Sequence, residues 1–300
     1  MITRDHKKDG VSLIVATLGE NDLCPLLDSL EKQTCKTYEC IVIDQSKEKR
    51  IQNVISKYEN IKYIHSNNKG NSHNRNIGID QAQMQILAFP DDDCFYDHDV
   101  IEKVLEVFRK RPEIDGISGN WMDSITRKVA MGGSKYKHVT KFNSWTSVTN
   151  LTIFLRSEIV KNVHGYDEMF GLGSNIFEGG EETDFIIKII EKEGLIIYYP
   201  DIRIWHRQEN YSLNKSKKQL GYEEAWGALF RKWSFRGRQK ILFFNAIIFL
   251  LFRSFVGALL WGLRGNFVNS RIYLMKNIAR FRGWIRYGSI KKALRDKYEL

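Results

Sequence analysis

Three consecutive carboxylates, Asp91, Asp92 and Asp93, form the densest group of chemically useful side chains in the sequence. They follow an apolar run that ends at Phe89, so they stand at the end of a predicted strand. Adjacent carboxylates repel one another, and a divalent cation offsets that repulsion while it neutralises a diphosphate. The alternative is ordinary loop chemistry, because aspartates favour loops and helix N-termini. We favour a metal site, in which one end of the Asp-x-Asp pair contacts a nucleotide ribose and the other contacts the metal.

A second group of acids, Glu181, Glu182 and Asp184, lies in the first turn of a predicted helix. Acids at this position complement the positive end of the helix dipole, which is one explanation for them. Gly179 and Gly180, however, offer bare backbone that a ligand approaches closely. A carboxylate beside such backbone is suited to deprotonate a hydroxyl as a general base. The pattern leaves open which of the three acids would have that role.

Two further polar residues lie next to predicted strand ends. His206 closes an apolar run, where a neutral imidazole is suited to complete an oxygen-rich Mn²⁺ or Mg²⁺ shell, although a packed histidine is the commoner case. Arg75 lies in the polar segment 69–76 at the start of a helix, where a guanidinium binds phosphate bidentately. The alternative for this segment is a solvated loop with asparagine caps.

The first 118 residues alternate short β-branched runs with longer amphipathic ones, which is typical of βαβ units in a largely parallel sheet. The chain is therefore expected to be an α/β protein. Ligands of such sheets bind beyond the carboxyl ends of the strands, so the polar segments after the runs are the candidate binding loops. The expected strands are 11–16, 39–43, 61–64, 85–89 and 114–118, and the expected helices are 23–33, 51–58 and 100–109.

Neither a G-x-G-x-x-G motif after the first strand nor a P-loop motif occurs in the sequence. Carboxylates and a metal would therefore have to hold any bound nucleotide. Residues 120–157 are aromatic and rich in glycine and serine, as expected of an acceptor-binding insertion or hairpin region. A helix over 181–192 and strands over 195–199 and 201–206 are expected to follow.

The order of these motifs resembles that of family 2 glycosyltransferases of the GT-A fold, of the kind found in bacterial polysaccharide synthesis. The resemblance extends from about residue 10 to residue 206. It implies a Rossmann-like, mostly parallel sheet with flanking helices. The segments that carry it are Val11–Thr17, Ile41–Ser46, Gly70–Gly78, Phe89–Cys94, Gly180–Phe185 and Trp205–His206.

The resemblance also implies how a nucleotide-sugar donor would be bound. Thr17 and Asp44 would hold the nucleobase, and Arg75 would lie near the base and the phosphates. Asp91, with Asp92 beside it, would contact the ribose.

The chemistry is implied in the same way. Asp93 would ligate a Mn²⁺ or Mg²⁺ ion together with His206 and Asp91, and Glu182 would be the base. The family usually has an aspartate at the position of Glu182, so Glu181 and Asp184 stay rival candidates. The implied mechanism is a single displacement that inverts the anomeric configuration without a covalent intermediate.

The formal net charge of +10 is unevenly distributed along the chain. Residues 1–210 carry 27 basic and 32 acidic side chains, whereas residues 211–300 carry 19 basic and 4 acidic ones. We therefore expect a catalytic domain over 1–210 and a basic helical region over 211–300. The four cysteines form no C-x-x-C pair, which favours a reducing, cytosolic compartment.

The basic region contains an apolar segment, residues 241–263, that is long enough to span a bilayer, since about 20 residues suffice. Arg253 interrupts it, and a central arginine costs roughly 2.5–3.5 kcal/mol on insertion scales. We therefore favour an interfacial or re-entrant segment over a true span, and a packed soluble helix third. Further apolar residues follow at helical spacing among arginines, a pattern that suits an anionic membrane surface better than nucleic acid. They are Leu274, Ile278, Phe281 and Ile285.

These features together predict an inverting, metal-dependent glycosyltransferase of the hexosyltransferase type that acts in polysaccharide or cell-envelope synthesis. Its expected donor is a UDP-linked sugar, and its expected acceptor is a lipid-linked glycan or a polysaccharide. The expected location is the cytoplasmic face of the membrane, as a peripheral or monotopic protein. The alternatives are a soluble protein glycosyltransferase and a non-catalytic protein that binds nucleotide sugars or nucleic acid.

Overall fold

The computed structural model describes residues 7–48, 50–207, 215–235 and 240–298. The chain divides into two compact units, one of residues 1–167 and 182–209, the other of residues 168–181 and 210–300. The expected domain boundary at 210 and 211 lies outside the described residues. The second unit also includes residues 168–181, a segment that the sequence did not separate from its neighbours.

The first unit is built on a ten-stranded sheet with the order β3-β2-β1-β4-β9-β6-β10-β5, with β7 on β6 and β8 on β10. Strands β1 to β4 are parallel to one another, and β6 is parallel to β10. The mixed α/β sheet with flanking helices confirms the expected fold class. The strands are β1 Lys8–Thr17, β2 Tyr38–Asp44, β3 Ile61–His65, β4 Met84–Ala88, β5 Phe95–Tyr96, β6 Gly116–Asp123, β7 Val129–Met131, β8 Lys137–His138, β9 Ile153–Arg156 and β10 Ile196–His206.

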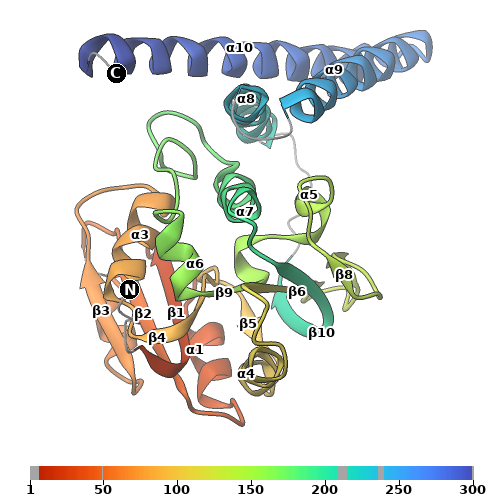
Figure 1. The fold of residues 1–300 in the computed structure, drawn as a ribbon. Coiled ribbons are helices and arrows are strands. Elements are labelled where there is room, and N and C mark those ends of the chain that lie inside the picture. The colour runs from red at the N-terminus through yellow and green to blue at the C-terminus, as the bar shows by residue number, and fades with distance from the viewer. Residues whose placement is uncertain (1–6, 49, 208–214, 236–239, 299–300) are drawn as a thin grey trace. The chain divides into compact units, whose positions relative to one another are not determined.

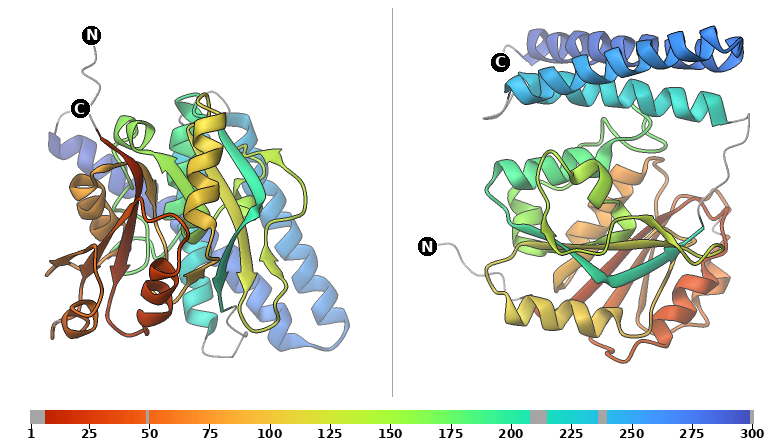
Figure 2. Two further views of the ribbon diagram at one scale, coloured as in Figure 1. Left: turned by 90° about the horizontal axis from the view of Figure 1, so that it is seen from below. Right: turned by 90° about the vertical axis from the view of Figure 1, so that its right-hand side faces the viewer.

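Helices cover both faces of this sheet, because alternate residues of its central strands point to opposite sides. In β1, Leu13 and Val15 pack on the face covered by α1 and α4, whereas Ile14 packs on the face covered by α3, α6 and α7 (Figures 1 and 2). Gly78 lets α3 lie close to β1, since a Cβ there would meet Ile14 at 2.2 Å. The helices are α1 Cys24–Glu31, α2 Gln52–Ile55, α3 Asn71–Gln81, α4 Val100–Lys110, α5 Ser144–Ser147, η1 Asn150–Thr152, α6 Ser157–Asn162 and α7 Glu181–Glu191.

The region after residue 120 departs from the sequence-based expectation in two ways. Strand β9 runs antiparallel between β4 and β6, where no strand was expected. The two strands expected over 195–199 and 201–206 are a single strand, β10, so that prediction was wrong. Its pairing with β6 shifts register between Tyr198 and Arg203, and the irregularity at Pro200 explains why the pattern looked like two strands.

Three helices, α8 Lys215–Ser234, α9 Lys240–Leu263 and α10 Phe267–Tyr298, make up most of the second unit. Helices α8 and α10 touch backbone to backbone at two glycines, as a Cβ on Gly227 or on Gly283 would lie 1.9 Å from a carbonyl oxygen of the other helix. Arg280 of α10 is buried and pairs with Glu223 of α8 at 2.6 Å. The same guanidinium donates to Ser254 of α9 at 2.8 Å, so one side chain joins all three helices.

Candidate active site

The carboxyl ends of β1 and β4 form the crevice in which ligands of open α/β sheets bind. The chain passes from β1 outward to β2 and β3, and then returns to the other side of β1 as β4. The loops that follow β1 and β4 therefore leave the sheet in opposite directions, which makes this edge a topological switch point. Thr17 ends β1, and the three aspartates follow β4.

Asp92 ties the two sides of this crevice together. Thr17 donates a hydrogen bond from Oγ1 to Asp92 Oδ2 at 2.5 Å, and Asn21 donates to Oδ1 at 2.8 Å. The backbone N–H of Gly19 in turn donates to Thr17 Oγ1 at 2.9 Å. Burial raises the pKa of Asp92, and the hydrogen bonds from Thr17 and Asn21 offset part of that rise. The middle aspartate thus fixes the loop after β1.

Asp44 ends the neighbouring strand β2 and is fully buried. Its Oδ2 accepts a hydrogen bond from the hydroxyl of Tyr63 at 3.0 Å, and its Oδ1 accepts one from the backbone N–H of Ser46 at 2.8 Å. Burial and the bond to Asp44 raise the pKa of Tyr63 to about 12. Through these hydrogen bonds, Asp44 fixes the start of the loop that follows β2, beside the crevice.

Arg75 and Asp91 form an ion pair in the crevice. The Nη2 atom of Arg75 lies 3.2 Å from Asp91 Oδ1, and the Arg75 side chain is only 3% exposed while that of Asp91 is 35% exposed. The guanidinium also lies 5.6 Å from the centre of the Tyr166 ring. Burial raises the pKa of Asp91, and the positive charge of Arg75 opposes that rise. The ion pair with Asp91 and the contact with the Tyr166 ring thus hold the Arg75 guanidinium beside the first of the three aspartates.

Asp93 and His206 meet because β5 pairs antiparallel with β10. Trp205 is opposite Phe95 in that pairing, so the next residue of β10 lies beside the aspartate turn. The Nε2 atom of His206 is 2.9 Å from Asp93 Oδ1. The Trp121 ring meets the His206 ring edge-on at 5.4 Å, and its Nε1 donates to the His206 carbonyl at 3.1 Å.

This geometry partly fits a divalent metal. Asp93 and His206 offer one oxygen and one nitrogen donor that already converge, and both side chains reach solvent. Asp91, the third expected ligand, instead points an oxygen at Arg75. Within the described ranges, no group of three or more histidine, cysteine, aspartate or glutamate side chains is placed to hold a metal. A metal here would need oxygens from a bound ligand to complete its shell.

The candidate base residues lie at the start of α7. Asp184 is fully buried and Glu181 is 6% exposed, whereas Glu182 is partly exposed. Phe185 of the same turn packs on Phe89, which precedes the aspartates, with ring centres 6.0 Å apart. This contact anchors the first turn of α7 to the end of β4.

Tyr166 was not singled out in the sequence, although it connects several parts of the site. Its ring lies 4.2 Å from that of Phe185 and 5.3 Å from that of Phe89. Asn76 of α3 pairs with its backbone through two hydrogen bonds, of 3.0 and 2.8 Å. Tyr166 lies in a loop without periodicity, so no sequence signal marked it. It positions Arg75 from α3 and Phe185 from α7 on one aromatic cluster.

Residues 12–159 match the sequence model of glycosyl transferase family 2. The protein is a family 2 glycosyltransferase. Solved structures agree on the fold: the crystal structure of S. aureus TarS 1–349 in complex with UDP-GlcNAc superposes with a TM-score of 0.65 at 16% identity. That comparison covers 96% of this chain and 92% of the TarS chain. The GT-A assignment is therefore confirmed.

Two relatives illustrate the family at the sequence level. The glycosyltransferase shares 26% identity over 195 residues with an uncharacterized glycosyltransferase of Haemophilus influenzae, and the match spans 63% of this chain and 64% of that protein. It shares 23% identity over 223 residues with the glucosyl-dolichyl phosphate glucuronosyltransferase of Haloferax volcanii, over 67% of this chain and 70% of that protein. The chain thus corresponds to about two thirds of these relatives.

Thr17→Val should loosen the loop after β1, because it removes the hydroxyl that donates to the half-buried carboxylate of Asp92. Hydrogen bonds to charged groups contribute about 1.5–3 kcal/mol, so hydrogen exchange of residues 17–21 should speed up by roughly tenfold or more. The control is Thr34→Val, which removes an exposed bond to Glu102 and should leave exchange nearly unchanged. Equal effects of the two substitutions would contradict the role given to Thr17.

Proposed function

We propose that this glycosyltransferase moves a sugar from a UDP-linked donor to a hydroxyl of a lipid-linked glycan or polysaccharide. The observation that carries the proposal is the convergence of Asp91, Asp93, Arg75 and His206 at the switch-point crevice, where such folds bind nucleotides. The UDP-GlcNAc bound to TarS supports the donor class. The dolichyl phosphate in the name of the Haloferax relative supports a lipid-linked acceptor.

When the donor binds, its diphosphate would replace Asp91 as the partner of Arg75. The Arg75 guanidinium, now on Asp91, would turn one or two N–H groups to the diphosphate, and Asp91 would then accept from the ribose hydroxyls. Thr17 and Asp44 would border the nucleobase, with Asp92 keeping the loop of Thr17 in place. These roles need little movement, because each side chain already has a hydrogen-bonded position.

Asp93 and His206 would hold a Mn²⁺ or Mg²⁺ ion, which when bound neutralises charge on the departing diphosphate. The donor's phosphate oxygens would fill the rest of its coordination shell. The support is the 2.9 Å approach of the two side chains and their access to solvent.

Glu182 would be the general base, since among the three candidate acids in the first turn of α7 it is the one that reaches solvent. It would take the proton from the acceptor hydroxyl as the hydroxyl oxygen attacks the anomeric carbon. The bond from that carbon to the diphosphate oxygen breaks at the same time, and the diphosphate leaves with the electron pair. Attack from the opposite side inverts the anomeric configuration.

The second unit would hold the enzyme at the cytosolic face of a membrane. Helix α9 is, among the described helices, the one that is long and apolar enough to cross a bilayer, within Ala246–Leu263, and only 17% of that stretch is buried. Phe249, Phe252 and Phe255 are each more than half exposed on it. The expected stripe on α10 is exposed as well. Side chains before residue 246 of α9 lie outside the described residues.

Asp93→Asn should weaken metal binding in the presence of UDP by more than about tenfold, because it removes a charged ligand; changes in the outer shell alone cost ten- to a hundredfold. Calorimetric titration of Mn²⁺ into the UDP-saturated protein measures this. Asp80→Asn, an exposed aspartate of α3, serves as the control and should bind Mn²⁺ normally. Unchanged affinity in Asp93→Asn would remove Asp93 from the metal site.

Glu182→Gln should abolish transfer while UDP still binds, because the amide cannot accept the acceptor's proton. General base catalysis contributes typically 10²–10⁴-fold, and a loss of that size is expected in the turnover rate for a panel of UDP-sugars. Glu158→Gln, which changes an exposed glutamate in the first turn of α6, is the matched control and should keep full activity. If Asp184→Asn shows this separation of binding from turnover and Glu182→Gln does not, Asp184 is the base.

Phe252→Ser should weaken membrane binding, because it removes an apolar side chain that is 65% exposed on α9. Burying such a side chain contributes about 1.5–3 kcal/mol, so partition onto vesicles of phosphatidylcholine and phosphatidylglycerol should fall roughly tenfold or more in a flotation assay. Phe142→Ser, 64% exposed in the first unit, should change nothing. Equal flotation of both variants would count against α9 as the membrane contact.

A further inference from the structure

A polar cavity of about 320 Å³ lies within the second unit, between the segment 168–181 and helices α8 and α10. Its volume is at the lower end of the range of small-molecule sites. The polar side chains that line it come from three parts of the chain that are distant in sequence. They are Ser174, Asn175 and Glu178 of the segment, Glu224 of α8 and Arg286 of α10.

The segment can form one wall of this cavity because its backbone closes into a compact loop. The N–H of Gly171 donates to the Phe177 carbonyl at 2.9 Å, and the N–H of Phe177 donates to the Met169 carbonyl at 3.0 Å. Gly171 and Gly173 have φ angles of 119° and 77°, which favour glycine. The Ser174 hydroxyl also donates to the Phe177 carbonyl, at 2.8 Å. The loop is thus fixed by its own hydrogen bonds.

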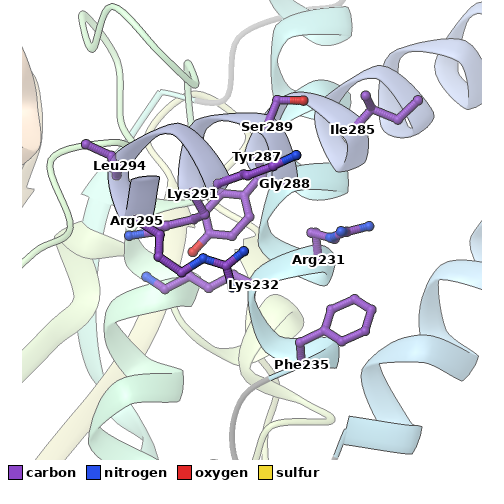
Figure 3. A pocket seen from close by; sticks show the side chains of 11 residues that line it. Arg231, Lys232, Phe235, Ile285, Tyr287, Gly288, Ser289, Lys291, Leu294 and Arg295 are labelled. Atoms are coloured by element: carbon purple, nitrogen blue, oxygen red, sulfur yellow. The ribbon is translucent and has the colours of Figure 1, made fainter. Parts of the chain in front are cut away.

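Helix α10 holds the loop in place. The Nη1 atom of Arg286 donates to the Ile176 carbonyl at 2.9 Å, and the guanidinium lies 5.4 Å from the centre of the Phe177 ring. Tyr287, which also lines a larger cavity of the unit (Figure 3), packs its ring 6.3 Å from that of Phe177. A cavity whose walls are already ordered loses less conformational freedom when a ligand binds.

The charges around the polar cavity disfavour an anionic ligand. Arg286 pairs with Glu224 at 3.0 Å, and the exposed Arg282 approaches the same carboxylate at 3.6 Å. Glu178 is a second acid of the lining, so the lining contains two carboxylates and one guanidinium. These groups suit a neutral ligand that both donates and accepts hydrogen bonds. The other acids of the segment lie outside the lining, and they are Glu168 and Glu181.

Hydrogen-bond acceptors and donors line the same cavity. A Cβ at Gly221 of α8 would lie 3.3 Å from Glu178 Oε2, so the glycine leaves room for this carboxylate. Glu178 is exposed, and its oxygens are open to hydroxyl donors. The bonds of Arg286 to Ile176 and to Glu224 both come from Nη1, and a guanidinium has two further nitrogens that donate. Adjacent hydroxyl groups of a ligand fit this mixture, because each hydroxyl donates and accepts.

The length of the chain ties the polar cavity to the candidate base. Glu178 precedes Glu182 by four residues, so their Cα atoms are at most about 14 Å apart in any conformation. Gly179 and Gly180 lie between them and offer bare backbone to a ligand. A glycan whose hydroxyl reaches Glu182 therefore has a neighbouring sugar ring within reach of the cavity.

We infer that the polar cavity binds a sugar ring of the acceptor, next to the ring that carries the attacking hydroxyl. Its hydroxyl groups donate to Glu178 and Glu224 and accept from Arg286. The ligand class is a neutral carbohydrate with adjacent hydroxyl groups. The inference rests on the proposed function in naming the ligand as the acceptor, but the binding itself needs neither the donor nor transfer.

The test titrates the full-length protein, without donor, with the methyl glycosides of glucose, galactose and N-acetylglucosamine, followed by ligand-observed NMR. Glu178→Gln should lower the affinity for the glycoside that binds best by about tenfold, since charge-assisted hydrogen bonds are the strong ones. Asp296→Asn, which changes an exposed carboxylate of α10 outside the lining, is the control and should leave the affinity unchanged. UDP affinity, measured in parallel, should be equal in both variants.

Gly221→Ala is the second variant, because it narrows the cavity without changing a charge. The new Cβ crowds the Glu178 carboxylate, whereas alanine favours the helix that contains it. Glycoside affinity should fall about fivefold, since added volume in a filled space is costly. The matched control is Gly262→Ala in α9, where a Cβ would make only an ordinary contact with Ser270 at 3.5 Å.

Three results would overturn the inference. Failure of all three glycosides to bind the unaltered protein would mean that the cavity takes no sugar ring. Equal losses in Glu178→Gln and Asp296→Asn would mean that the sugar senses general surface charge. Full affinity in Gly221→Ala would mean that the sugar binds elsewhere. Normal UDP binding alongside any of these results contradicts the cavity alone, whereas loss of UDP binding in the unaltered protein contradicts the proposed donor site.

Discussion

The antiparallel pairing of β5 with β10 is the constraint that brings Asp93 and His206 together at the candidate site of the first unit. β5 has only two residues, yet it follows the aspartate turn directly and lies at the edge of a long strand. Its short ladder is reinforced by side chains: the rings of Phe95 and Trp205 stack at 6.1 Å, and Trp205 donates to Asp97 at 2.6 Å. Because this pairing fixes the end of β10, its last residue, His206, lies beside Asp93.

The parallel half of the sheet was well predicted from sequence, for a physical reason. Strands covered by helices on both faces are apolar at most positions, so the central residues of β1, β2 and β4 stand out as largely apolar runs. Strand β9 was not predicted, because its apolar run is short and it follows a region of irregular segments. Pro200 splits the pattern of β10 although pairing with β6 resumes beyond it.

The site was predicted less completely than the sheet. Residue type, with a position next to a predicted strand end or at the start of a predicted helix, identified the aspartates, Arg75 and His206 as candidates. The family resemblance then implied a role for each. The bond from Thr17 to Asp92 depends on loop conformation between residues distant in sequence, and no pattern encodes it. The role of Tyr166 likewise depends on packing between α3 and α7. The net charge of the C-terminal region was also an incomplete guide to its binding partners. Arg280 and Arg286 form ion pairs with Glu223 and Glu224 inside the bundle, so part of the positive charge is neutralised there.

The membership of residues 168–181 in the second unit has a consequence for how the polypeptide folds. Phe170 and Phe177 of this segment are nearly inaccessible, and both rings pack 6.3 Å from that of Tyr287 on α10, while Arg286 donates to the Ile176 carbonyl at 2.9 Å. The last residue of this segment, Glu181, is the first residue of α7, the helix that carries Glu182. A ribosome must therefore finish α10 before the stretch leading into that helix acquires its native neighbours. Helix α7 is therefore synthesised well before the segment that leads into it can reach its final packing.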